Sequence, residues 1–171
     1  PAFKDLYVYL DGELIGFGTT DENGSAVFTF KVPLIPGGEH LVEVYDLEEI
    51  YYGYTKLYVL AKIDIYPVSI TVPGTVYIEA TGLRQYQKVL IYLDGNYLST
   101  YPANKSGAFS IKINIPLIEE GEHTIYLLDV ETLELVGNAS ITVKSKLDQV
   151  LTKLDDIIAV ITSLNGTIVS I

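Results

Sequence analysis

Apolar and polar residues alternate along much of the first 144 residues of the chain. In AFSIKINI (108–115), for example, every second side chain is apolar, which is the period of a β-strand with one buried face. Turn signals such as Asp94-Gly95 separate these stretches, because glycine adopts the positive φ of a tight hairpin turn at little cost. In the second half of the chain, the pattern predicts strands near 69–72, 75–81, 87–93, 97–101, 108–115, 122–129 and 135–144.

The same pattern occurs twice, with an offset of 83 residues. PLIPGGEH (33–40) aligns with PLIEEGEH (116–123), and residues 1–46 share twelve identities with residues 84–129. The alternation of 26–32 also matches that of 109–115, which predicts a strand in both places. Seven short strands with regular turns are typical of an immunoglobulin-like β-sandwich. The sequence therefore predicts an all-β fold of two such sandwiches in tandem.

We expect one sandwich in 1–62, called the first repeat below, and another in 63–144, called the second repeat. The counterpart of 63–83 would have to lie before Pro1, so the first repeat is expected to lack its first strands. Such a sandwich exposes an apolar groove and unpaired sheet edges. Either upstream chain or a strand donated by another subunit is expected to fill that place.

From residue 145 the apolar period becomes helical. Spacings of 3 and 4 alternate, as in the a and d positions of a coiled coil, and the residues are Leu147, Val150, Leu154, Ile157, Ile161, Leu164, Ile168 and Ile171. Leu151, Ile158 and Val160 widen this seam. A wide, isoleucine-rich seam favours three or four helices over two. Residues 145–171 are therefore predicted to start a coiled-coil stalk of a homo-oligomer, a trimer or else a tetramer, which continues past Ile171.

Two alternatives exist for this segment. The helix could pack on its own sandwich, or it could enter a membrane. The apolar stretch 157–171 is shorter than the about twenty apolar residues that a membrane span needs. Ser163, Asn165 and Gly166 also interrupt it. Contact with a membrane is therefore expected only through a segment outside this sequence.

The composition argues against several classes of function. The formal net charge of −11 repels phosphate backbones and anionic headgroups, so a nucleic-acid partner is not expected. Cysteine is absent, which excludes disulfides and thiolate metal sites. Fourteen tyrosines suit a strand-rich chain. No nucleophile motif, phosphate-binding loop or dinucleotide fingerprint is present, so the chain is not expected to be an enzyme and no catalytic residue is assigned.

Histidines and carboxylates recur at equivalent places in the two repeats. His40 and His123 each start a strand after a tight turn, and a structural role explains them better than catalysis, although pH sensing is a further possibility. The acidic pairs Asp11/Asp94, Glu39/Glu122 and Asp46/Asp129 also lie at turns and strand ends, where aspartate stabilises the local backbone. Asp21 and Asp94 are weak calcium candidates; no other metal ligand or cofactor is expected.

Four of the six asparagines stand in Asn-X-Ser/Thr. They are Asn23, Asn104, Asn138 and Asn165. Such sequons are the acceptors of N-linked glycans on exposed loops of exported proteins. Their frequency indicates a glycosylated extracellular protein.

The repeated pattern YLDG…G…F…I…P…GEH…D resembles the immunoglobulin-like repeats of archaeal and bacterial surface proteins. Sandwiches followed by an Ile/Leu coiled coil resemble the stalk subunit of crenarchaeal S-layers, the SlaB type. In that family, β-sandwich domains lead into a trimeric coiled coil that ends in a membrane anchor, and the stalk holds the outer lattice protein above the cytoplasmic membrane. The resemblance implies an archaeal cell-envelope protein whose partner is the S-layer lattice protein.

The leading hypothesis is thus a trimeric, glycosylated stalk that supports a surface layer. The first alternative is a subunit of an extracellular filament or adhesin, in which subunits donate strands to one another. The second is a carbohydrate-binding accessory module of a secreted glycosidase, for which Tyr7, Tyr9 and Tyr92 are the candidate contacts.

Overall fold

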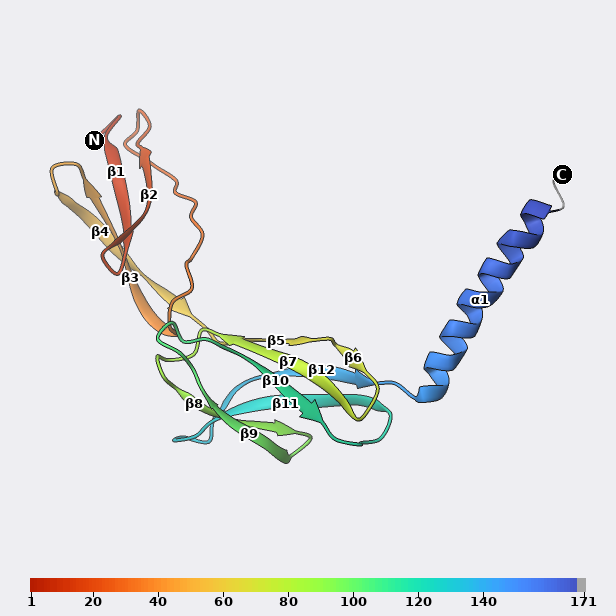
Figure 1. Cartoon of the computed structure of the whole chain (residues 1–171). Coiled ribbons are helices and arrows are strands. Elements are labelled where there is room, and N and C mark those ends of the chain that lie inside the picture. Colours follow the sequence, from red (N-terminus) through yellow and green to blue (C-terminus); the bar gives the residue numbers. More distant parts are fainter. Residues whose placement is uncertain (169–171) are drawn as a thin grey trace.

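The computed structural model describes residues 1–168, with Lys146, Asp148, Gln149 and 165–168 described by their backbone alone. Within that range the chain is mostly β-structure, with twelve strands followed by one helix (Figure 1). The strands fall into three sheets, one in the first repeat and two in the second. Their arrangement follows the repeated sequence pattern closely, with one informative exception.

The second repeat is a β-sandwich of two sheets. Its strands are β5 (Lys62–Tyr66), β6 (Ser69–Ile70), β7 (Gly74–Thr81), β8 (Lys88–Leu93), β9 (Asn96–Pro102), β10 (Phe109–Ile115), β11 (Gly121–Asp129) and β12 (Leu135–Val143). One sheet has the order β10-β7-β5 and the other β6-β12-β11-β8-β9. The inward residues of both sheets form one core, whose fully buried members include Ile78, Ile91 and Ile125. The predicted strands from 69–72 to 135–144 agree with these bounds to within two residues, except that the first of them is shorter.

The first repeat contains a single sheet. Its strands are β1 (Asp5–Leu10), β2 (Glu13–Thr19), β3 (Gly38–Asp46) and β4 (Tyr51–Val59). They pair in the order β2-β1-β3-β4, which corresponds to β9-β8-β11-β12 of the second repeat. The registers also correspond, since Leu6 lies opposite Asp46 as Val89 lies opposite Asp129. Residues 83 positions apart therefore correspond in strand pairing as well as in sequence.

Residues 26–32 do not form the predicted strand. Their alternation does place Phe28 and Phe30 against the buried residues Val8, Leu10 and Val42. However, a strand also needs hydrogen-bonding partners, and β10 obtains its partners from β7 along its whole length. Among residues 1–168 the first repeat has no counterpart of β7. The side-chain pattern was therefore interpreted correctly, while the strand prediction was wrong because the pairing strand is absent.

The helix α1 (Lys146–Ile168) follows the last strand after a short connection. It projects away from the sheets (Figure 1), so packing on its own sandwich is not what the structure shows. The described chain contains no second helix beside it, and the predicted coiled coil therefore requires other copies of the chain. In the part of the chain that is described, no helix is long and apolar enough to cross a membrane.

The two repeats meet at a tight contact between backbones. Strand β4 continues into β5 through residues 60–61. Beside this connection, Gly37 N–H donates a hydrogen bond to Leu83 O (2.6 Å), and Leu83 N–H donates to Gly107 O (2.9 Å). A Cβ atom on Gly37 would lie 1.9 Å from Gly82 O, and one on Gly107 would lie 1.9 Å from Leu83 O. The contact therefore accommodates glycine alone at these two positions.

Candidate functional sites

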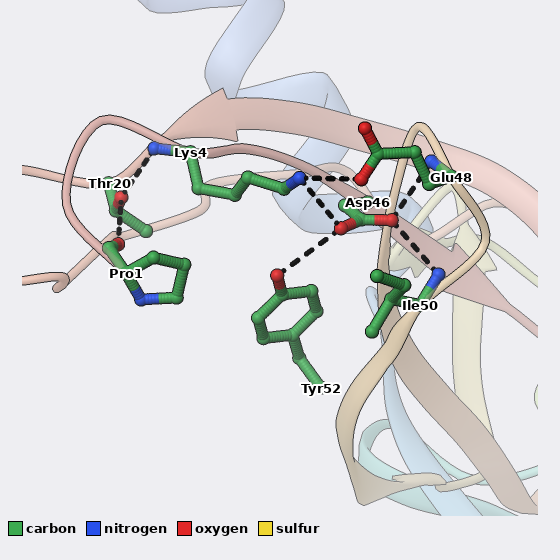
Figure 2. A network of polar contacts seen from close by, with 7 residues as sticks. All are labelled: Pro1, Lys4, Thr20, Asp46, Glu48, Ile50 and Tyr52. Carbon is green, nitrogen blue, oxygen red and sulfur yellow. Dashed lines mark hydrogen bonds and ion pairs between the residues drawn. The ribbon is translucent and has the colours of Figure 1, made fainter.

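Asp46 is the centre of a polar network at the end of β3 (Figure 2). Its carboxylate accepts hydrogen bonds from the backbone N–H groups of Glu48 and Ile50, both at 2.9 Å. Lys4 Nζ lies 3.0 Å from the same carboxylate, and the Tyr52 hydroxyl lies 3.2 Å from it. Burial raises the pKa of Asp46, but the hydrogen bonds from Ile50 and Lys4 lower it by a larger amount. The net pKa is below the ordinary value, so the carboxyl ionises more readily than usual.

Asp129 occupies the equivalent place at the end of β11. Its side chain is 5% exposed and accepts bonds from Arg84 Nη2 at 2.6 Å and Gln87 Nε2 at 2.5 Å. The backbone N–H groups of Glu131 (2.7 Å) and Thr132 (3.0 Å) complete its shell. The bond from Thr132, with the other three, outweighs burial and lowers the pKa of Asp129 to about 2.

Both aspartates therefore hold the loop that follows their strand. Their oxygens are saturated by local donors, which leaves none free to abstract a proton from a substrate. No sequence pattern marks their partners, because the two repeats use different residues for the purpose. Lys4 stands where the second repeat has Gln87, and Pro1 stands where it has Arg84.

His40 and His123 each form a second repeated contact. His40 lies 2.5 Å from Asp11 through Nδ1 and 2.8 Å from Pro36 O through Nε2. His123 lies 2.5 Å from Asp94 and 2.9 Å from Glu119 O. Both ring nitrogens face oxygen acceptors, and both can donate only when the ring is protonated to the imidazolium. These pairs connect the β1–β2 turn to β3 and the β8–β9 turn to β11.

The pKa values of these pairs agree with that geometry. Burial lowers the pKa of His40, but the bonds to Asp11 and Pro36 raise it above its ordinary 6.5. The bond to Asp94 raises the pKa of His123 in the same direction. The bond from His40 lowers the pKa of Asp11. Each pair is therefore charged in the folded protein at mildly acidic pH.

We expect the stability of the protein to fall as pH rises through the raised histidine pKa. A folded-state pKa above the unfolded value of 6.5 gives stability that is complete below that value and is lost above it. Replacing His40 and His123 together by glutamine should remove this dependence, because glutamine does not titrate in this range. Thermal unfolding from about pH 6 to about pH 9 measures it. A wild-type midpoint that rises with pH, or a variant with the wild-type slope, would contradict the expectation.

The asparagines of the predicted glycosylation sites occupy different positions. Asn23 and Asn104 are exposed in the equivalent turns after β2 and β9, and Asn138 is exposed within β12. The equivalent of Asn104 is Asp21, since each accepts two backbone N–H bonds that close its turn. The side chain of Asn165 lies outside the described residues.

The calcium candidates take part in these same local contacts. The Asp21 carboxylate closes a turn, and the Asp94 carboxylate accepts bonds from His123 and from Thr124 N–H. Residues 1–168, as far as their side chains are described, contain no group of three His, Cys, Asp or Glu that could hold a metal ion. Calcium binding at Asp21 or Asp94 therefore stays a prediction without added support.

The tyrosines named for carbohydrate binding lie half-buried on the outer faces of the sheets. Tyr9 packs edge-on against Tyr45, with ring centroids 5.7 Å apart, and Tyr92 stacks on Tyr126 at 5.9 Å. The rings of Tyr9 and Tyr92 thus each pack against a neighbouring tyrosine of the same sheet.

The predicted oligomerisation residues form an exposed apolar face on α1. We call this face the α1 seam; its described members are Leu147, Val150, Leu154, Ile157, Ile161 and Leu164. Each is between 49% and 65% exposed, and the flanking Leu151, Ile158 and Val160 are exposed to a similar degree. The Ile168 side chain and Ile171 lie outside the described residues. The seam thus leaves a row of apolar side chains on α1 open to solvent.

No protein-family model and no curated protein matches the chain. Among solved structures, it is similar to the central fibronectin-III array of RIM-binding protein, with 11% identity and a TM-score of 0.40 over 84% of this chain and 58% of that one. The chain thus spans less than two thirds of that structure.

Two further similar structures cover more of their own chains. The D0-D1 domain of intimin matches with 13% identity and a TM-score of 0.31, over 83% of each chain. The fibronectin(III)-like modules of Clostridium thermocellum CbhA match with 15% identity and a TM-score of 0.30, over 84% of this chain and 79% of theirs. At these scores the similarity concerns the β-rich fold alone, so function is argued from the chain itself.

Proposed function

We propose that this chain is a structural, non-catalytic part of an extracellular cell envelope, in which α1 forms a trimeric stalk that carries the β-repeats and supports a surface layer. The observation that carries this proposal is the α1 seam. Full burial of one such side chain contributes about 1.5–3 kcal/mol of transfer free energy. Six described members on each chain therefore give a large driving force for association.

The helix itself also depends on association. Most of the stability of a helix in a protein comes from the packing of its apolar face, and α1 projects away from the sheets with its seam exposed. Aspartates 155 and 156 lie on the side of α1 away from the seam, at positions b and c of the heptad. The seam has leucine and isoleucine at both a and d, one valine at d, and further apolar residues at e and g, a pattern that favours three or four helices over two.

The exposed sequons and the local role of the acidic residues fit this proposal. Asn23, Asn104 and Asn138 are accessible to a glycosylating enzyme. The repeated carboxylates and histidines join turns to strands, so they support the shape of the repeats. The proposed partner at the far end from α1 is a lattice protein of the surface layer.

The molar mass of the chain in solution tests the stalk. Light scattering at micromolar concentration is expected to give three times the chain mass of 18.9 kDa. The double variant L154D/I161D should be monomeric and should lose helical circular dichroism, because two aspartates per chain would be buried in the trimer. The matched control A159D changes position f, opposite the seam, and should stay trimeric. A monomeric wild-type chain would contradict the proposal.

One observation favours a second candidate function. The backbone of 26–35 makes no hydrogen bond with other backbone among the described residues, and an unpaired extended segment can accept a strand. A filament or adhesin subunit would use it to join neighbouring subunits. The seam and this segment are independent, and the next subsection concerns the segment.

A further inference from the structure

The second repeat shows what covers the inner face of a complete repeat. Strand β7 pairs with all of β10, from Phe109 opposite Ala80 to Ile115 opposite Gly74. Strand β5 then pairs with β7 on its other side. Under these two strands Leu127 and Ile141, which belong to β11 and β12, are no more than 1% exposed.

The equivalent positions of the first repeat are open. Val32 is 38% exposed, whereas its counterpart Ile115 is 1% exposed. Val44 and Leu57, the counterparts of Leu127 and Ile141, are only partly buried. Among the described residues, the core of the first repeat contains three buried hydrophobic residues, whereas the core of the second repeat contains eighteen.

One glycine locates the uncovered part of the sheet. Gly137 on β12 is covered by Ile63 of β5, whose Cδ1 would lie 2.7 Å from a Cβ atom built on that glycine. Its counterpart on β4 is Gly53, because Gly53 lies opposite Val44 as Gly137 lies opposite Leu127. A Cβ atom on Gly53 would meet nothing within 4 Å. The space that β5 fills in the second repeat is thus empty in the first.

We infer that residues 26–32 are the acceptor for one antiparallel β-strand with the residue pattern of β7, supplied by polypeptide joined directly to Pro1. The occupant places β-branched or small apolar residues inward at alternate positions, as Val76, Ile78 and Ala80 do. A second strand, with the pattern of β5, pairs with the far side of this strand and covers Gly53.

The environment of Pro1 determines the direction from which this strand arrives. In the second repeat, β7 ends at Thr81 and the chain reaches Leu83, which is buried and donates its N–H to Gly107 O. The position before Pro1 is the counterpart of Leu83. Pro1 O already lies 3.2 Å from the Cβ position of Gly24, the counterpart of Gly107. Pro1 O also accepts a bond from Thr20 Oγ1 at 2.8 Å. The end of the added strand therefore joins Pro1 without a linker, which favours the same polypeptide over a neighbouring subunit.

A fusion built from the chain's own sequence tests the inference. A copy of residues 61–83 is placed directly before Pro1, in the full chain and in L154D/I161D, so that the result does not depend on the trimer. Amide hydrogen exchange of 26–32 is expected to slow by roughly 100-fold or more. The control fusion carries V76D and I78D in the added copy, which buries two charges, and should leave 26–32 unprotected.

Two outcomes would overturn the inference. If the intact fusion leaves exchange of 26–32 unchanged, the segment is not a strand acceptor. If a separate peptide of residues 61–83 at micromolar concentration protects 26–32 as fully as the fusion does, a strand from another molecule is the occupant and the assignment to the same polypeptide is wrong. Protection by the fusion alone confirms both parts of the inference.

Discussion

Replacing Asp129 by alanine is expected to lower the free energy of unfolding of the second repeat by about 3 kcal/mol. The substitution removes one acceptor from four donors: Arg84, Gln87 and the backbone N–H groups of Glu131 and Thr132. Arg84 is 60% exposed and regains water readily. The loss therefore comes mainly from the donors beside the buried carboxylate, which keep no partner. Denaturant titration followed by tyrosine fluorescence measures it, since the chain has no tryptophan.

The variant D129N separates the charge of Asp129 from its hydrogen bonds. Its remaining carbonyl oxygen can still accept the backbone N–H bonds, so its loss of stability should be smaller than that of D129A. The folded-state pKa of about 2 lies below the ordinary 3.8. A depressed pKa gives stability that is present above the unfolded value and is lost as pH falls through the folded value. Between about pH 5 and about pH 2, wild type should therefore lose about 2 kcal/mol more than D129N.

The comparison with D129N is necessary because Asp11, Asp46 and Asp94 also have lowered pKa values. These groups contribute to acid unfolding in both proteins and cancel in the difference. Equal acid dependence of wild type and D129N would show that the Asp129 charge is not stabilising. Equal stability of wild type and D129A would show that the loop after β11 does not need its anchor.

The sequence predicts most of the strands in the second repeat because their information is local. Alternation and turn residues lie within each strand or next to it, as in 108–115. Strand β5 was not predicted, since KIDIY (62–66) lies between the repeats where no turn signal separates it from β4. The heptad likewise located α1, which starts at Lys146, because its period differs plainly from that of the strands.

Contacts between distant residues were harder to predict. The offset of 83 residues showed that Asp11 and His40 recur as Asp94 and His123, but it did not show that each aspartate touches its histidine. The pairing of β1 with β3 places them together. The strand at 26–32 failed for a related reason: its apolar side is encoded locally, whereas its hydrogen bonds depend on a strand that pairs with it from elsewhere.

Replacing Gly107 by alanine is expected to destabilise the second repeat by about 2–5 kcal/mol. Gly107 has a φ of +67°, a left-handed conformation that costs an L-residue about 1–2 kcal/mol. In addition, the new Cβ would lie 1.9 Å from Leu83 O and 2.8 Å from Pro36 Cα. Neither atom belongs to a flexible side chain, so backbone has to move, which adds about 1–3 kcal/mol.

The matched control is Gly24 of the first repeat. It occupies the equivalent turn with a φ of +78°, but a Cβ there would meet Pro1 O at 3.2 Å, which a small shift relieves. The variant G24A therefore reports mainly the backbone strain, and the excess cost of G107A over G24A reports the clash with Leu83 O of the second repeat and with Pro36 Cα of the first. Denaturant titration of the two variants under the same conditions gives this difference.

Amide exchange shows which part of the structure is disturbed in G107A. Moving Leu83 away from a new side chain at position 107 would break the bond from Gly37 N–H to Leu83 O, which is 2.6 Å long. Amide exchange at Gly37 should therefore accelerate in G107A and stay unchanged in G24A. If the two variants instead lose equal stability and Gly37 is equally protected in both, the repeats are not held by this contact. Their relative orientation would then depend only on the continuation of β4 into β5, and the two repeats would bend against each other at that point.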